Sequence, residues 1–187
     1  MTPHQKAMRA PRTETSDRAI GFLARKRVPL GFVTTIAALI LARPTWSSWR
    51  YGLLVALIGA AIRVWAAGHL EKGREVTTSG PYALTRHPLY LGSSIMGAGL
   101  AIAAHSVPVA VIVIAYLVVT IYAAVRSEEA HLTEKFGGTY PAYREGRAQT
   151  AARQFSFARA WRNREYRALL GFAAAIGLLA VRPWIRI

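Results

Sequence analysis

The sequence predicts an all-α protein: an integral membrane helical bundle of about five transmembrane helices, with a polar C-terminal segment on the cytosolic side. Two observations carry this prediction. First, 53% of the 187 residues are hydrophobic although the formal net charge is +15. Second, long apolar runs alternate with short basic segments, so charge and apolar surface are separated along the chain. We treat residues 1–187 as one domain.

Five apolar runs define the predicted helices in chain order, and several approach the roughly 20 residues that cross a bilayer. Pro44, beside Trp46 and Trp49, marks the first turn, and Ser106 with Pro108 separates the third run from the fourth. The last run is short. The runs are 28–42, 51–70, 89–105, 107–125 and 169–181.

Lysine and arginine gather on one side of this topology. Residues 1–28, 71–88 and 126–168 hold 19 of the 24 basic residues. Because cytoplasmic loops carry the positive excess, we expect residues 1–27 to form a basic cytosolic tail, and the N-terminus to be cytoplasmic and the C-terminus external. The expected location is a multi-pass position in a prokaryotic cytoplasmic membrane, in contact with membrane lipids.

Two polar segments follow the apolar runs. The fourth helix has no breaker after Val125, so we expect it to continue until Gly137 and Gly138 stop it. This carries Glu128 and Glu129 past the membrane edge. Residues 151–167 mix arginines with aromatic residues and are expected to form either an interfacial helix or a solvated basic linker.

Composition excludes several classes of function. Without cysteine the chain has no disulfide, thiolate nucleophile or cysteine metal site, and we expect no metal centre. The arginine excess is also found in nucleic-acid-binding proteins, but no recognition helix or aromatic platform accompanies it here. We therefore expect no nucleic-acid partner.

Arg63 stands within the second apolar run, where a charge costs about 3 kcal/mol or more unless it is paired or hydrated. One interpretation is that Arg63 meets the carboxylate or phosphate of a substrate. The other is an ion pair with a carboxylate such as Glu71 or Glu129, or snorkelling to the interface.

The polar residues near the membrane edge permit a binding function. His87 and Tyr90 are three apart at a helix start and share a face. Tyr140 and Tyr143 are also three apart and follow a glycine hinge, as in a mobile lid. Taken singly, His87 and Tyr90 are more typical of interfacial anchors than of a binding site, and Glu128 and Glu129 of partners for Arg126.

The ordered set of motifs resembles one family: the isoprenylcysteine carboxyl methyltransferases and the related membrane phospholipid N-methyltransferases. The matching pieces are Gly80-Pro81-Tyr82, Arg86-His87-Pro88-Leu89-Tyr90-Leu91-Gly92, Glu128-Glu129, Leu132, Phe136-Gly137, Tyr140 and Tyr143. The resemblance covers residues 50–147, which we take as the catalytic core. Residues 148–187 then form an interfacial segment and the last helix, and here the chain departs from many relatives.

The resemblance implies methyl transfer from S-adenosyl-L-methionine, bound by a cytosolic C-terminal segment, to a lipophilic or lipid-anchored acceptor. An isoprenylcysteine-type carboxylate is favoured, with phospholipid or amine N-methylation and thiol S-methylation as alternatives. A sterol-type reductase and a membrane scaffold are the alternatives of other classes. For a carboxylate acceptor, the candidate catalytic cations are Arg63, Arg144 and Arg147. The expected cofactor-binding residues are Tyr82, Arg86, His87, Pro88, Tyr90, Gly92, Glu128, Glu129, Tyr140 and Tyr143.

Overall fold

The computed structural model describes residues 14–137, 139–147 and 153–185, and every regular element in these ranges is helical. The predicted all-α class is therefore confirmed for this part of the chain. In order, the elements are α2 (Glu14–Leu41), α3 (Trp46–His69), the 3-10 helix η1 (Gly80–Ala83), α4 (Pro88–Ala104), α5 (Val107–Phe136), α6 (Thr139–Arg144), α7 (Phe157–Arg162) and α8 (Glu165–Ile185).

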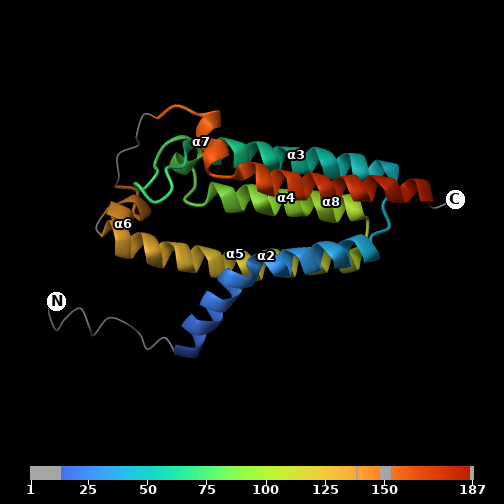
Figure 1. Cartoon of the computed structure of the whole chain (residues 1–187), viewed down its shortest axis with the longest axis horizontal. Coiled ribbons are helices and arrows are strands. Elements are labelled where there is room, and N and C mark those ends of the chain that lie inside the picture. Colours follow the sequence, from blue (N-terminus) through green and yellow to red (C-terminus); the bar gives the residue numbers. More distant parts are fainter. Residues whose placement is uncertain (1–13, 138, 148–152, 186–187) are drawn as a thin grey trace.

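The long helices run roughly parallel to one axis (Figure 1). The tight turns after α2 and α4 lie at one end of the bundle, together with the end of α8. The polar segments that contain η1, α6 and α7 lie at the other end. The two turns are tied together, because the Arg43 amide donates to the Ala104 carbonyl oxygen at 2.8 Å. This up-and-down order agrees with the alternation of basic segments in the sequence.

Helices α3 and α4 pack with almost no side chain between them. A Cβ atom built on Gly52 would lie 2.5 Å from the backbone of α4, and one built on Gly59 would lie 2.6 Å from the Gly92 carbonyl oxygen. Gly99 approaches the Gly52 carbonyl oxygen in the same way. Small residues of this kind let membrane helices approach closely and gain van der Waals contact. The interface therefore fixes the position of α4 relative to α3.

Three helical segments in the described part of the chain are long and apolar enough to cross a membrane: Trp46–His69, Val107–Phe136 and Glu165–Pro183. The apolar part of α2, Val28–Leu41, and helix α4 are shorter. Helix α4 is limited at both ends, because Pro88 opens it and His105 closes it in a left-handed conformation with φ 47°. The structure thus identifies three spans of full length where the sequence predicted about five.

Large apolar side chains cover the outside of the bundle. Phe32, Tyr51, Val107 and Leu170 are each about two thirds exposed or more. The protein core, by contrast, is built mostly from small residues, with Ala38, Ala103, Val109 and Leu179 among the most buried. Apolar surface of this extent is typical of contact with lipid.

Helix α2 begins earlier than the sequence suggested. Residues 14–27 were expected in a basic tail but form the first part of α2, and residues 1–13 lie outside the described residues. Figure 1 shows a bend along α2, and Pro29 inside the helix accounts for it. Basic residues are good helix formers in their own right, so a basic segment can continue the helix, and the cytosolic location of residues 1–27 stays a prediction.

The predicted extension of the fourth apolar run is confirmed. Helix α5 continues without a break to Phe136, and Gly137 ends it with φ 51°.

Helix α8 includes the last apolar run and extends from one end of the bundle to the other (Figure 1). At its far end Arg182 Nη1 donates to the Ala42 carbonyl oxygen at 2.7 Å and to the Leu39 carbonyl, which caps α2.

Candidate active site

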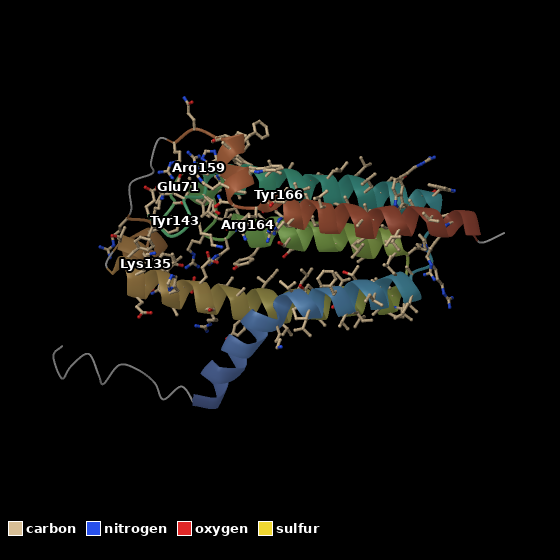
Figure 2. The ribbon with its side chains drawn as sticks, in the orientation of Figure 1. Glu71, Lys135, Tyr143, Arg159, Arg164 and Tyr166 are labelled. Carbon is tan, nitrogen blue, oxygen red and sulfur yellow. The ribbon has the colours of Figure 1, made fainter. Side chains whose placement is uncertain are left out.

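The matching motifs converge at the polar end of the bundle, although they are spread over some sixty residues. His87 occupies the N-cap position of α4, and Pro88 follows as the first helical residue. Glu128 and Glu129 belong to the part of α5 that extends towards α6, and Tyr140 and Tyr143 belong to α6. Figure 2 shows the labelled Tyr143 and Lys135 at the same end as Glu71 and Arg159.

Glu129 is the centre of this cluster. One carboxylate oxygen, Oε1, lies 3.3 Å from His87 Nε2 and accepts a hydrogen bond from the Tyr140 hydroxyl at 3.3 Å. Arg86 Nη1 donates to the same oxygen at 3.5 Å. These donors come from the η1–α4 connection and from α6, so the carboxylate joins three segments. A carboxylate oxygen can accept hydrogen bonds from several polar groups at once, and charged donors strengthen such bonds.

Glu128 faces a different neighbour. The Tyr90 hydroxyl donates to Glu128 Oε2 at 2.8 Å, and the His87 and Tyr90 rings lie 5.8 Å apart. The predicted common face of His87 and Tyr90 is therefore present. Adjacent residues on a helix point about 100° apart, which explains why the two glutamates bind different partners.

Helix α6 is held against the site by its two tyrosines. Tyr140 is 2% exposed. The Tyr143 hydroxyl donates to the Tyr82 carbonyl oxygen at 2.5 Å, which joins α6 to η1. Burial and the nearby Glu129 raise the pKa of Tyr140 to about 12, and burial also raises the pKa of Tyr82 and of Tyr143. All three phenols are therefore hydrogen-bond donors at neutral pH.

A cleft of about 410 Å³ opens beside these tyrosines. Its wall carries two arginines, Arg86 and Arg144, and several hydroxyl groups, which makes it polar and cationic. Arg144, one of the three predicted cations, thus lies next to Tyr143 at the site. The lining residues are Thr78, Tyr82, Ala83, Leu84, Thr85, Arg86, Tyr143, Arg144 and Gly146.

The other two predicted cations are engaged by carboxylates. Arg63 forms a two-pronged ion pair with Glu165, with Nε donating to Oε1 at 2.6 Å and Nη2 to Oε2 at 3.0 Å. The pairing interpretation was right in kind, but the partner is neither Glu71 nor Glu129. Arg147 pairs with Glu145 on the surface, where both side chains are about half exposed or more.

Glu165, the partner of Arg63, was not predicted from the sequence. Its signal was present: Glu165 is the one acidic residue between Arg153 and Arg167, and it lies a few residues before the last apolar run. A charge in the second run needs a counter-charge from another helix. Glu165 lies 102 positions from Arg63 in the chain, so their pairing depends on how α8 packs against α3.

The segment around α7 packs against the end of α3 and does not form one long helix. Helix α7 is short, and it satisfies the carbonyl groups at the end of α3. Asn163 Nδ2 donates to the Ala67 and Leu70 carbonyl oxygens at 2.9 and 2.8 Å. Arg159 donates to the Gly68 carbonyl oxygen at 2.5 Å and to Glu71 Oε1 at 2.8 Å. Helix ends need such partners, so α7 caps the end of α3.

The sharing of Glu71 between two arginines adds charge attraction to this cap. The Arg159 guanidinium holds the pKa of Glu71 below its usual range, with Arg162 contributing in the same direction. Phe157 and Trp161 lie on the outer face of α7 and are 76% and 68% exposed. Residues 151 and 152 of the predicted interfacial helix lie outside the described residues.

Two curated proteins are similar to part of this chain. Two curated relatives match 127 residues at 29% identity: the nickel-cobalt-cadmium resistance protein NccN of Alcaligenes xylosoxydans xylosoxydans and the cobalt-zinc-cadmium resistance protein CzcN of Cupriavidus metallidurans. The matched region covers 62% of this chain and spans about 60% of the length of each relative. No solved structure gives a significant match.

A family comparison matches the central part of the chain. The phospholipid methyltransferase family matches residues 54–139, a range that contains most of the α3–α4 interface, the Arg-His-Pro motif, and Glu128 and Glu129 of α5. The resemblance inferred from the motifs is thereby confirmed, since residues 54–139 of this chain match the phospholipid methyltransferase family.

Proposed function

We propose that this protein is a membrane methyltransferase that transfers a methyl group from S-adenosyl-L-methionine to a lipophilic or lipid-anchored acceptor. The convergence of Arg86, His87 and Tyr140 on Glu129 carries the proposal. Arg86 and His87 lie within the range of the family match, and Tyr140 directly follows its last residue, 139. A purely structural anchor at the membrane edge would not require three donors on one carboxylate oxygen.

The residues present fit the proposed cofactor by their chemistry. Glu128 and Glu129 offer carboxylates for its ammonium or ribose hydroxyl groups, and Arg86 suits its carboxylate. When bound, S-adenosylmethionine supplies an activated methyl group, because the electron pair of the S–CH₃ bond remains on the sulfur. The protein therefore needs to bind, orient and exclude water, without a nucleophile of its own. Tyr140 and Tyr143 close α6 over this region in the proposal.

The acceptor is proposed to be a carboxylate of the isoprenylcysteine type. Such an acceptor benefits from a nearby cation. Of the three predicted arginines, Arg144 lines the cleft, whereas Arg63 and Arg147 are already paired with glutamates. We therefore assign the acceptor-binding role to Arg144. N-methylation of a phospholipid or amine, or S-methylation of a thiol, would instead depend on Glu128 and the aromatic rings near it.

We place the site on the cytosolic side of a membrane bundle of about five helices. The basic segments of the sequence lie at the site end, which supports a cytosolic C-terminal segment and a cytoplasmic N-terminus. Helix α4 and the shorter apolar part of α2, Val28–Leu41, then cross as part of the bundle. Phe157 and Trp161 suit the lipid headgroup region at this level.

The names of the two relatives favour a second, physiological candidate: a contribution to resistance against divalent metals. The side chains described here include no group of three or more His, Cys, Asp or Glu residues that would bind a metal. We therefore propose that such resistance would follow from methylation of a membrane component. Growth of a deletion strain on cadmium or cobalt, complemented with wild type or with Glu129→Gln, tests this: equal complementation would disprove it.

Calorimetric titration with S-adenosylhomocysteine tests the principal proposal. Wild type in lipid nanodiscs is expected to bind, and His87→Ala and Glu129→Ala are each expected to weaken binding about tenfold or more because charge-assisted bonds are lost. Glu134→Ala, on the same helix and exposed, is the matched control and should bind like wild type. No binding by folded wild type would refute the methyltransferase assignment.

A further inference from the structure

We propose that the Arg63–Glu165 ion pair positions the first turn of α4 and thereby sets the cofactor affinity of the site, so that α8 is part of the functional unit. This inference rests on the proposed methyltransferase function. It concerns two residues that do not contact the Glu129 cluster directly. Their role is to hold the element that carries His87 and Tyr90.

The Arg63 guanidinium joins three helices. Arg63 belongs to α3, and its Nε and Nη2 atoms bind both carboxylate oxygens of Glu165, the first residue of α8. Its third nitrogen, Nη1, donates to the Leu89 carbonyl oxygen at 3.3 Å and to the Ser93 hydroxyl. Leu89 lies in the first turn of α4 and Ser93 in the second, where the Ser93 hydroxyl also donates to the Leu89 carbonyl oxygen at 2.9 Å. One side chain therefore fixes the start of α4 between α3 and α8.

Both charges are largely withdrawn from solvent, since the Arg63 and Glu165 side chains are only 16% and 7% exposed. A two-pronged arginine–carboxylate pair at this burial has a defined geometry as well as a favourable energy. If one partner is removed, the other is left as a buried, uncompensated charge. It must then attract water or move, and the first turn of α4 moves with it.

The first turn of α4 depends on such contacts because local capping is weak. The N-cap residue His87 makes no side-chain hydrogen bond to the helix, so a common source of rigidity at a helix start is absent. The His87 ring instead faces Glu129 and Tyr90. The same turn thus carries two proposed cofactor contacts on one side and the Arg63 anchor on the other.

Gly92 makes this arrangement possible. A Cβ atom at Gly92 would lie 2.6 Å from Arg63 Cγ and 2.7 Å from the Gly59 carbonyl oxygen. The last glycine of the Arg-His-Pro motif therefore leaves room for the Arg63 side chain to run along α4. Arg63 and Gly92 both lie within the range of the family match. Glu165, which carries the opposite charge to Arg63, lies outside that range. In this chain the family core is completed by α8.

The test is a double-variant cycle read by two measurements: the Kd for S-adenosylhomocysteine in lipid nanodiscs and the unfolding temperature of the same samples. Arg63→Gln and Glu165→Gln are each expected to raise Kd about tenfold. The double variant, which buries two neutral amides, is expected to return to within about threefold of wild type. Ser93→Ala keeps the ion pair but removes one anchor to α4, and should raise Kd about threefold without a large change in unfolding temperature.

Glu71→Gln is the matched control. The Arg159–Glu71 pair has a similar length of 2.8 Å and similar burial, with side chains 15% and 16% exposed, but it joins α7 to the end of α3 and does not touch α4. Glu71→Gln should lower the unfolding temperature while Kd stays within about twofold of wild type.

The outcomes separate the two proposals. Tight binding by wild type together with unchanged Kd in the Arg63, Glu165 and Ser93 variants would overturn the positioning role and leave the methyltransferase assignment intact. An equal loss of affinity in Glu71→Gln would also overturn it, because the effect would then reflect general loosening. If folded wild type does not bind, the proposed function fails, and this inference fails with it.

Discussion

Substitution of Gly92 by alanine examines a close contact between α3 and α4. Gly92 lies in α4 against α3, where an added methyl group would stand 2.6 Å from Arg63 Cγ and 2.7 Å from the Gly59 carbonyl oxygen. Neither neighbour can yield easily, because one is backbone and the other belongs to a side chain anchored by Glu165. The helices must therefore move apart.

The magnitude follows from these distances. Carbon atoms in contact prefer about 3.5 Å or more, so α3 and α4 must separate locally by close to an ångström. Overpacking of this kind costs about 1–3 kcal/mol, and replacing glycine in a helix returns up to about 1 kcal/mol. The net loss for Gly92→Ala is about 1–2 kcal/mol. Gly177 in α8 has nothing within 4 Å of a built Cβ atom, so Gly177→Ala should stabilise by up to about 1 kcal/mol.

Thermal unfolding of the two variants in the same nanodiscs gives the comparison. The two free energies differ by about 2–3 kcal/mol, which for a chain of this size separates the unfolding temperatures by roughly 5–10 °C. Gly92→Ala should also weaken binding of S-adenosylhomocysteine, because the methyl group displaces Arg63. If Gly92→Ala were as stable as Gly177→Ala, the close α3–α4 packing described above would be wrong.

Two further predictions concern the polar end. Because the pKa of Tyr140 is raised to about 12 from 10.0, the unfolded chain releases this proton before the folded protein does; the associated stability is present below pH 10 and is lost as the pH rises towards 12. Unfolding temperature measured from pH 9 to 12 should therefore fall more steeply in wild type than in Tyr140→Phe, and equal slopes would contradict the burial of this phenol. Asn163→Ala removes both donors from the end of α3 and should cost about 1–3 kcal/mol in denaturant unfolding. Gln154→Ala, at an exposed position nearby, is the control, and equal stability of the two variants would argue against capping by α7.

Much of the helix order was accessible from the sequence because hydrophobic runs and glycine breakers act locally. The end of α5 at Phe136 follows from the absence of a breaker before Gly137, and the shared face of His87 and Tyr90 follows from helical spacing. The order of the motifs also predicted the family. These inferences need only the chain near each residue and the general physics of helices.

Long-range pairing was not accessible in the same way. Nothing near Arg63 in the sequence identifies Glu165 as its partner, because the pair depends on how α8 lies against α3 and α4. The sequence also left Glu128 and Glu129 equivalent. Their separation into a partner of Tyr90 and a partner of His87 depends on the rotation of α5 about its axis, which tertiary packing decides.

The scarcity of negative charge makes these pairings informative. The chain has 24 basic residues and only 9 acidic ones, so an acidic residue placed among arginines is seldom needed for solubility. Five glutamates pair with arginine in the described part of the chain: Glu71, Glu75, Glu129, Glu145 and Glu165. Four of these pairs join segments that are far apart in the sequence, whereas the Glu145–Arg147 pair is local. It follows that neutralising a glutamate removes a specific tertiary connection, whereas neutralising most arginines removes one of several similar charges. Glutamate-to-glutamine substitutions are therefore the sharper probes of how this site is assembled.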